Sequence, residues 1–447
     1  MLSPAVFKAY DVRGIVPDEL DADGMRQIGA AYVGAFEPRT VAIGHDMRLT
    51  SPELAAALAD GVTGAGADVI LIGQVGTEML YYAVGEHGYE GGLQVTASHN
   101  PAAYNGVKIV RRGAQPVGSD SGLETIKRRA LGPPAEAAAR GSTSRADMYP
   151  GFVERVLRFV DPSAIGPLRV VLDGANGMAG PMIGPLLERL PVEVVPYNLE
   201  PDGSFPNHEP NPLLPENRAL VIDRVRDAGA DLGIAWDGDA DRCFFIDDTG
   251  EFVPGDLITA LIARLMLERH PGAAIVYDLR ASWAVRDTVL AGGGRPLENR
   301  VGHAFIKARI RKEDAVFAGE VSGHYYFKDF YWCDTGMVPA LVLLELLSRA
   351  GRPLSELLAP FRERYHISGE INSTVADVPV KLQELKDAYG PRALRVSHLD
   401  GVSFEFADWH FNVRPSNTEP LLRLNLEALS AFEMEARRDE VLALIRS

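Results

Sequence analysis

Three aspartates stand at alternate positions in the loop WDGDADR, and an arginine follows them directly. Asp237, Asp239 and Asp241 can direct carboxylate oxygens at one hard cation, and such cations prefer oxygen ligands. An EF-hand calcium loop counted from Asp237 requires glycine at its sixth position, where this chain has Arg242. The spacing therefore predicts a metal site that is not an EF-hand. Arg242 suits a phosphate that also contacts the cation, and a surface arginine that balances local charge is the alternative interpretation.

A serine and a histidine are neighbours in the bend TASHNP. The GxSxG elbow of α/β-hydrolases is missing around Ser98, and Ser98 and His99 would not automatically face each other as nucleophile and base. Ser, Asn and Pro are also common turn residues. From this segment alone, Ser98 can be a nucleophile, a phosphate binder or a turn residue.

Glu320, Ser322 and His324 alternate in FAGEVSGHYYF, directly after an apolar run. On extended backbone, a period of two places all three on one side of the strand. A carboxylate, a hydroxyl and an imidazole on one side would suit a polyhydroxylated ligand. An ordinary half-exposed strand explains the same pattern equally well.

The segment NVRPSNTEPLLR carries four polar residues in an expected tight bend, Arg414, Ser416, Asn417 and Thr418. Their side-chain and backbone donors suit a phosphate dianion. A polar hairpin turn without any ligand is the alternative interpretation.

The elements that must position these segments follow a repeating pattern. From residue 41 onward, apolar runs of strand length alternate with segments of helical period, as in βαβ units with a largely parallel sheet. Ligands collect at the carboxyl ends of the strands in such sheets, so the polar loops are expected there. The first expected strands span residues 41–46, 67–73 and 91–98, and the first expected helices span 51–66 and 77–88.

Changes in composition divide the chain into four blocks. Residues 128–150 are rich in Ala, Gly, Pro and Ser, which indicates a linker or surface excursion. After residue 362 the pattern changes to antiparallel alternation with turns, typical of a smaller α+β domain. The predicted domains are 1–147, 148–250 and 251–361, all α/β, and 362–447, which is α+β.

Charge and composition limit the partners. The 447 residues carry a formal net charge of −16, which disfavours nucleic acid or an anionic membrane surface as a partner. The two cysteines, Cys243 and Cys333, form no CxxC pair and predict neither a disulfide framework nor a zinc site. With no signal-peptide core and no apolar run of about 18 residues, the sequence predicts a cytoplasmic protein.

Seven segments, taken in order, resemble the α-D-phosphohexomutase superfamily over essentially the whole chain, most closely its bacterial phosphomannomutase branch. The segments are FKAYDVRG, VTASHNPAAYNGVKIV, PDGSFPNHEPNPLLPE, DGDADRCFFID, VGHAFIKARIRKEDA, GEVSGHYYFKDF and RPSNTEP. The resemblance implies a heart-shaped, four-domain architecture in which each domain sends one loop into a central cleft. Three domains would share an α/β core, and the fourth would resemble the TATA-box-binding protein.

The same resemblance assigns roles by matching motif positions. It implies that Ser98 carries the phosphoryl group as phosphoserine and that one Mg²⁺ is held by Asp237, Asp239, Asp241 and a phosphate oxygen on Ser98. The other implied catalytic residues are His99, Lys108, Arg242 and His324, with Lys108 and His324 as candidates for proton transfer. The implied substrate-binding residues are Tyr10, Arg13, Arg280, His303, Glu320, Ser322, Arg414, Ser416, Asn417, Thr418 and Arg423.

The implied reaction interconverts mannose 6-phosphate and mannose 1-phosphate through a hexose 1,6-bisphosphate, in a monomer or homodimer that binds only small hexose phosphates. Glucose phosphates, alone or beside mannose phosphates, are the alternative substrates, and a non-catalytic sugar-phosphate or cation-binding protein is the alternative from another class. Departures from the family pattern are few. Glu78 stands where many members have proline, and His45 where arginine is common.

Overall fold

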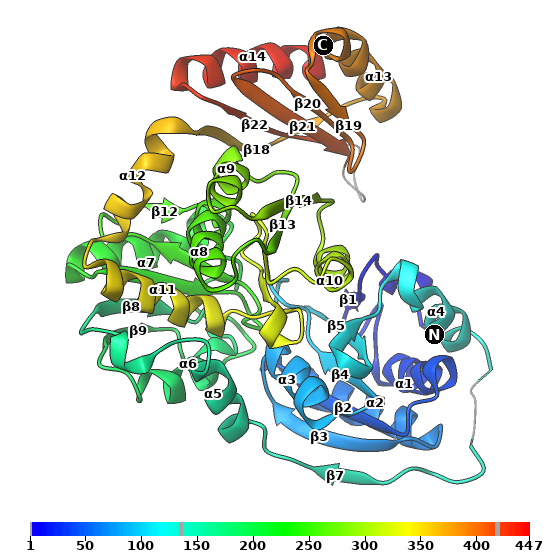
Figure 1. Cartoon of the computed structure of the whole chain (residues 1–447). Helices are drawn as coiled ribbons and strands as arrows, with labels where there is room; N and C mark the ends of the chain where they lie inside the picture. Colours follow the sequence, from blue (N-terminus) through cyan, green and yellow to red (C-terminus); the bar gives the residue numbers. More distant parts are fainter. Residues whose placement is uncertain (1, 134–136, 416–420) are drawn as a thin grey trace.

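The structure, a computed structural model, describes residues 2–133, 137–415 and 421–447. Four β-sheets follow one another along the chain, and we call the units built on them the first to fourth domains. In Figure 1 the four domains form an arc, with the first domain in blue at one end and the fourth in orange and red at the other. The expected four-domain architecture is confirmed.

The first domain has a seven-stranded sheet in the order β1-β5-β4-β2-β3-β7, with β6 paired to β5. Strands β4, β2, β3 and β7 run parallel, whereas β1, β5 and β6 join in antiparallel fashion. The strands are β1 (Val12–Ile15), β2 (Thr40–His45), β3 (Asp68–Gln74), β4 (Gly91–Val95), β5 (Tyr104–Arg111), β6 (Gln115–Pro116) and β7 (Thr143–Arg145). The helices are α1 (Ala22–Phe36), α2 (Ser51–Gly64), α3 (Thr77–His87) and α4 (Leu123–Ala130).

Alternating side chains give the first sheet two buried faces. Val41 and Ile43 of β2 join the core that contains residues of α1, α2 and α4, whereas Ala42 joins the core that contains α3. This is the period of two that a strand covered on both faces requires. The expected strand 91–98 ends earlier, at Val95, because the chain turns away before Ser98.

The second and third domains repeat one plan, a parallel group of three strands followed by antiparallel strands. The second sheet has the order β12-β11-β10-β8-β9 and the third β14-β13-β15-β16-β17. Elements of the second domain are α5 (Tyr149–Leu157), β8 (Arg169–Asp173), α6 (Ala179–Leu187), β9 (Glu193–Tyr197), α7 (Pro215–Ala228), β10 (Leu232–Trp236), β11 (Cys243–Ile246) and β12 (Phe252–Val253). Those of the third are α8 (Gly255–Arg269), β13 (Ala274–Asp278), α9 (Trp283–Ala291), β14 (Arg295–Asn299), α10 (His303–Lys312), β15 (Phe317–Gly319), β16 (Tyr325–Phe327), β17 (Cys333–Asp334) and α11 (Met337–Ala350).

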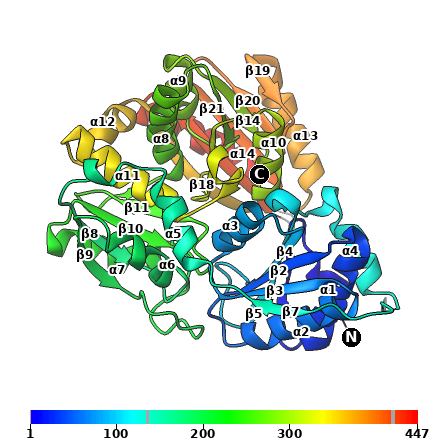
Figure 2. The same cartoon turned by 60° about the horizontal axis from the view of Figure 1, so that its bottom comes forward.

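One large core joins the first three domains. It contains Met79 of α3, Met182 of α6 and Leu341 of α11, all buried. Glu78, at the start of α3, is also buried and accepts a hydrogen bond of 3.3 Å from the backbone N–H of Met337. Figure 2 shows the first and second sheets side by side. The loops that follow their strands are therefore fixed relative to one another.

The fourth domain is an antiparallel sheet with its own core. Its order is β18-β22-β21-β20-β19, and in Figure 1 the helices α13 and α14 cover one face while the other face is turned toward the third domain. α12 (Leu354–Arg364) leads into it and runs through the predicted boundary at residues 361/362. The remaining elements are β18 (His366–Thr374), α13 (Val378–Tyr389), β19 (Arg395–Ser397), β20 (Val402–Glu405), β21 (Trp409–Pro415), β22 (Leu421–Ala428) and α14 (Ala431–Arg446).

Among the described residues, no helix has the length and apolar character needed to span a membrane.

Candidate active site

Ser98 lies in a constrained bend after β4. Its backbone has φ = 51°, the left-handed region that residues other than glycine adopt infrequently and mainly where surrounding contacts enforce it. The Ser98 N–H donates to Thr96 Oγ1 at 2.9 Å, and the Ser98 carbonyl accepts from Arg48 Nη2 at 2.8 Å. A Cβ on Gly238 of the acidic loop would lie 2.5 Å from that carbonyl oxygen, so only glycine allows the two loops to approach this closely.

The three aspartates meet Ser98 at the carboxyl end of β10. All three are buried, and Ser98 Oγ donates a hydrogen bond of 2.8 Å to Asp237 Oδ2. One oxygen of each aspartate lies within 4.8 Å of the others, and the Oδ1 atoms of Asp239 and Asp241 are buried without a hydrogen-bond partner. Burial and the two neighbouring carboxylates raise the pKa of Asp237 to about 7. These clustered oxygen ligands, two of them unsatisfied, fit a hard divalent cation.

Cationic side chains enclose the aspartates. Lys108 on β5 places Nζ 2.6 Å from Asp239 Oδ2 and also contacts Asp241 Oδ2. Burial opposes its charge, but these carboxylates outweigh burial and raise the pKa of Lys108 above its ordinary value. Arg242 donates its backbone N–H to Asp237 Oδ1 at 3.2 Å and places its guanidinium Nε 3.5 Å from Asp237 Oδ2. Lys108 therefore holds Asp239 and Asp241, and Arg242 lies beside Asp237, the carboxylate to which Ser98 Oγ donates.

His99 points its ring back at the serine. Its Nδ1 lies 3.2 Å from Ser98 Oγ. Burial, followed by the charges of Arg242, Arg13 and Lys108, lowers the pKa of His99 well below its ordinary value. The imidazole is therefore neutral at neutral pH, and its lowered pKa makes it a weak base.

Glu320, Ser322 and His324 do not form an extended strand. Strand β15 ends at Gly319 and β16 begins at Tyr325, with a tight turn between them. The N–H of Glu320 donates to the His324 carbonyl at 3.0 Å, and Gly323 takes φ = 84°, which suits glycine. The expectation of a period-two strand was wrong, because this turn rather than sheet pairing organises the segment.

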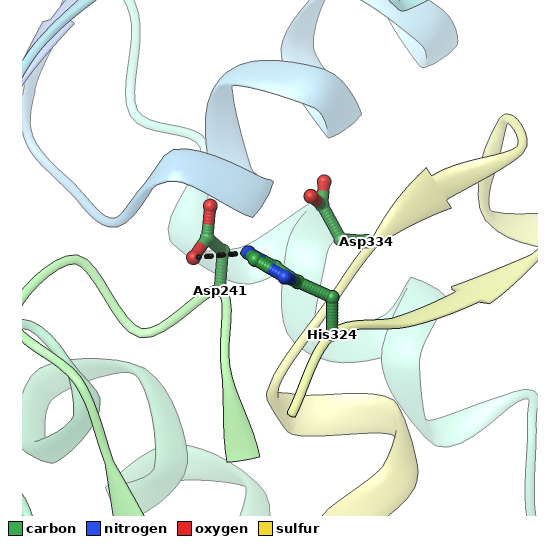
Figure 3. A group of neighbouring side chains, drawn as sticks. All are labelled: Asp241, His324 and Asp334. Carbon is green, nitrogen blue, oxygen red and sulfur yellow. Dashed lines mark ion pairs between the residues drawn. The ribbon is translucent and has the colours of Figure 1, made fainter. Parts of the chain in front are cut away.

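The turn still brings the three side chains together. His324 Nδ1 lies 3.3 Å from Glu320 Oε2 and 3.1 Å from Ser322 Oγ. Figure 3 shows the opposite edge of the ring directed at Asp241, with Nε2 3.5 Å from Asp241 Oδ1. Burial and Arg242 lower the pKa of His324, but Asp241 and Glu320 outweigh them and raise it to about 9. The ring is therefore charged at neutral pH and links the acidic loop to the third domain.

Tyr10, Arg13 and His303 lie at the edge of this cluster. Arg13 on β1 donates to Asp11 Oδ2 at 2.5 Å and to Asn100 Oδ1 at 2.6 Å, so it braces the serine bend. The rings of Tyr10 and His303 meet edge to face with centroids 5.4 Å apart, and those of His303 and His324 are 6.0 Å apart. The first and third domains thus both contribute to the site.

The remaining predicted binding residues lie between the third and fourth domains. Arg280, after β13, makes two side-chain hydrogen bonds to Asp278. Arg414 on β21 and Arg423 on β22 are cross-strand partners. These three arginines all reach one carboxylate, that of Glu370 on β18. Ser416, Asn417 and Thr418 lie outside the described residues.

Sequence reasoning missed several residues that support the site. Arg48 is buried and donates to the backbone carbonyls of Ser98, Asn100, Pro101 and Tyr104, so it holds the whole serine bend. The sequence could have indicated Arg48 by its position just after β2. The carboxyl end of β2 lies at the same sheet edge as that of β4, which the serine bend follows. Thr77 hydrogen-bonds Asp239 Oδ2 through its hydroxyl.

A buried lysine and aspartate in the third domain were also missed. Lys307 Nζ lies 2.7 Å from Asp334 Oδ1 and donates to Tyr81 Oη at 2.8 Å. Asp334 lies close to Asp241 and His324 in Figure 3, with ligand atoms of the three within 4.8 Å of one another. No pattern in the sequence pairs these residues, because each lies on an element whose neighbours are set only by the fold.

Comparison with known proteins covers the chain from end to end. The phosphoglucomutase/phosphomannomutase α/β/α domains I, II and III match residues 4–132, 150–250 and 254–365, and the C-terminal domain of that family matches 370–444. The phosphomannomutase of Salmonella montevideo is 45% identical over 99% of this chain and 99% of that protein. A protein of Xanthomonas campestris pv. campestris named phosphohexose mutases is 44% identical over 100% of both chains.

A solved structure agrees in sequence and in shape. A phosphoglucomutase/phosphomannomutase family protein from Burkholderia thailandensis superposes with a TM-score of 0.91 at 35% identity, covering 99% of this chain and 97% of that one. Four family domains in order, full-length relatives and a superposable structure point the same way. The chain therefore belongs to the phosphoglucomutase/phosphomannomutase family.

Proposed function

We propose that the protein is a phosphomannomutase, which interconverts mannose 6-phosphate and mannose 1-phosphate through a phosphoserine at Ser98 and a hexose 1,6-bisphosphate. Relatives named phosphomannomutase that match over nearly the full length support the substrate. The observation that carries the mechanism is the hydrogen bond of 2.8 Å between Ser98 Oγ and Asp237 in a buried acidic cluster. The proposal includes one Mg²⁺ per chain, and a cytoplasmic monomer or homodimer.

In the proposed reaction the phosphoryl group moves between two oxygens, Ser98 Oγ and a hydroxyl oxygen of the sugar. The bond from phosphorus to Ser98 Oγ breaks as a bond from phosphorus to a sugar hydroxyl oxygen forms, and the proton that this hydroxyl loses is balanced by the proton that Ser98 Oγ gains. The second half reverses these changes with the phosphate at the other end of the sugar. Such reactions depend on positioning and on neutralising charge at the transferring group. Mg²⁺, held by Asp237, Asp239 and Asp241 when bound, supplies part of that neutralisation.

The chain's own side chains supply the rest of the neutralisation and the proton transfers. Lys108 and Arg242 place positive charge beside the aspartates that meet Ser98, in the region where negative charge accumulates during transfer. His324, charged at neutral pH, is suited to donate a proton to an oxygen, and Lys108 is the other candidate. The neutral His99 ring, with Nδ1 3.2 Å from Ser98 Oγ, is assigned to orient the serine.

Sugar recognition is assigned to the third and fourth domains. Glu320 Oε1 accepts from the N–H of Gly302 and Oε2 accepts from the Tyr326 hydroxyl, which fixes the carboxylate for contact with sugar hydroxyls. Ser322 offers a hydroxyl beside it. Arg280, Arg414 and Arg423 are assigned to the phosphate that does not react, together with Ser416, Asn417 and Thr418. Tyr10, Arg13 and His303 complete the substrate-binding set.

The test uses purified protein with Mg²⁺ and a trace of hexose 1,6-bisphosphate. We expect turnover of mannose 1-phosphate, and none in Ser98→Ala, because that variant has no oxygen to carry the phosphoryl group. Ser163→Ala, at an exposed serine, is the matched control and should keep full activity. Wild-type activity in Ser98→Ala would refute the assigned nucleophile.

Glucose 1-phosphate is the second substrate to measure. Mannose and glucose differ only at C2, and the relative named phosphohexose mutases favours action on more than one hexose phosphate. Values of kcat/KM for the two substrates, measured under the same conditions, decide between a phosphomannomutase and a dual-specificity enzyme. Binding of both sugars without turnover of either, in protein that cannot be phosphorylated, would favour a binding protein instead.

A further inference from the structure

Glu370 lies on the open face of the fourth domain's sheet, beside two arginines. Residues of odd and even position alternate across this sheet: Val413 and Leu424 are buried in the core, so Arg414 and Arg423 lie on the opposite face. Glu370 pairs in register with Asn425 of β22 and shares that face. Strands β18, β22 and β21 are adjacent, which puts the carboxylate next to both guanidinium groups.

The contacts are direct and use both carboxylate oxygens. Arg414 Nη2 donates to Glu370 Oε2 at 2.9 Å, and Arg423 Nη1 donates to Glu370 Oε1 at 3.3 Å. Arg280 of the third domain brings Nη1 to 3.7 Å from Oε2. Burial opposes ionisation of Glu370, but Arg414, Arg280 and Arg423 outweigh burial and hold its pKa below the ordinary value. We call Arg280, Arg414 and Arg423 the arginine clamp.

The arginine clamp needs an anion even without substrate, because two of its arginines face each other on neighbouring strands. Arg414 and Arg423 are directly opposite each other on neighbouring strands, and like charges in such pairs destabilise a sheet. One carboxylate that bonds both guanidinium groups offsets this repulsion. A phosphate dianion would offer the same groups more oxygens and more charge.

We propose that Glu370 is a positioning residue that occupies the arginine clamp in place of the sugar phosphate and competes with it for the same guanidinium donors. This inference rests on the proposed function, in which the clamp holds the phosphate that does not react. The bisphosphate must release the clamp, turn, and bind again by its other end before the second transfer. A carboxylate ready to take back the donors lowers the cost of that release.

The competition predicts an unusual kinetic signature for Glu370→Gln. Gln keeps the size of Glu but has no negative charge and only one acceptor oxygen, so it competes less well for the arginines and the clamp should hold phosphate more tightly. We expect KM for mannose 1-phosphate to fall about tenfold, the size of one charge-assisted bond, and kcat to fall by a similar factor because release slows. A merely structural role would instead raise KM and lower the thermal midpoint.

A binding measurement separates this inference from the proposed function. In the non-reacting Ser98→Ala background, calorimetric titration with mannose 1-phosphate should show tighter binding when Glu370→Gln is added. Glu405→Gln is the matched control, because Glu405 on the same sheet pairs with Arg286 at 2.5 Å and contacts no clamp arginine. Failure of wild-type turnover would overturn the proposed function alone. Unchanged or weaker binding in Glu370→Gln would overturn the competition alone.

Discussion

Lys108 is the only described side chain whose ammonium group contacts both Asp239 and Asp241. Replacing Lys108 therefore measures how much this ammonium group stabilises the two buried carboxylates. In Lys108→Met the two carboxylates remain buried, with 0% and 2% of their side chains exposed, but lose their cation. Removing one partner of a buried ion pair costs about 3–5 kcal/mol. At about 2 °C per kcal/mol, the thermal midpoint measured in EDTA should fall by roughly 6–10 °C.

Magnesium should restore part of this loss. The cluster without Lys108 carries more uncompensated negative charge, so a divalent cation should bind it more tightly than it binds the wild-type cluster. A ligand at 100 times its Kd stabilises the folded state by about 2.7 kcal/mol. Calorimetry with EDTA and with Mg²⁺ should therefore show a larger upward shift in Lys108→Met than in wild type.

The control is Lys312→Met, at an exposed lysine, which should match wild type in both buffers. The reasoning would be refuted if Lys108→Met were as stable as wild type in EDTA. Equal stabilisation of wild type and Lys108→Met by Mg²⁺ would also refute the reasoning. It would mean that the Lys108 ammonium group and the metal do not bind the same carboxylates.

Two further predictions concern the metal and the pH. EDTA should abolish mutase turnover and excess Mg²⁺ should restore it; full activity after exhaustive chelation would reject the metal role of the three aspartates. The pKa of His324 is raised to about 9, above its ordinary value, so the stability that its charge contributes is complete below about pH 6.5 and is lost as pH rises to about 9. Thermal midpoints in EDTA should fall more across this range in wild type than in His324→Gln, and parallel curves would contradict the assignment.

Local pattern predicted the elements that carry the active site. The strands expected at 41–46 and 67–73 appear as β2 and β3, each displaced by one residue. They were predictable because each contains an apolar run that the fold buries. The acidic loop and the serine bend each follow a strand. Because ligands bind at the carboxyl ends of strands in such sheets, both segments could be predicted to lie at the ligand site. The end of β4 was predicted too late, since Thr96 is as compatible with a strand as with the turn that it makes.

Contacts between distant segments could not be predicted from pattern. Arg48 contacts carbonyls about 50 positions away, and Lys307 meets Tyr81 across 226 positions. Glu370 has no local signal in the sequence, because it contacts arginines from two other strands and from another domain. The segment 320–324 shows the converse limit: its alternation suggested a strand, but Gly323 with φ = 84° closes a turn instead.

The most direct test of the central claim is the covalent state of Ser98. After incubation with a hexose 1,6-bisphosphate and Mg²⁺, intact-mass and peptide analysis should find one phosphoryl group per chain, located on Ser98, and mannose 1-phosphate should remove or exchange it. Full mutase turnover with Ser98 unmodified at every stage would contradict the account.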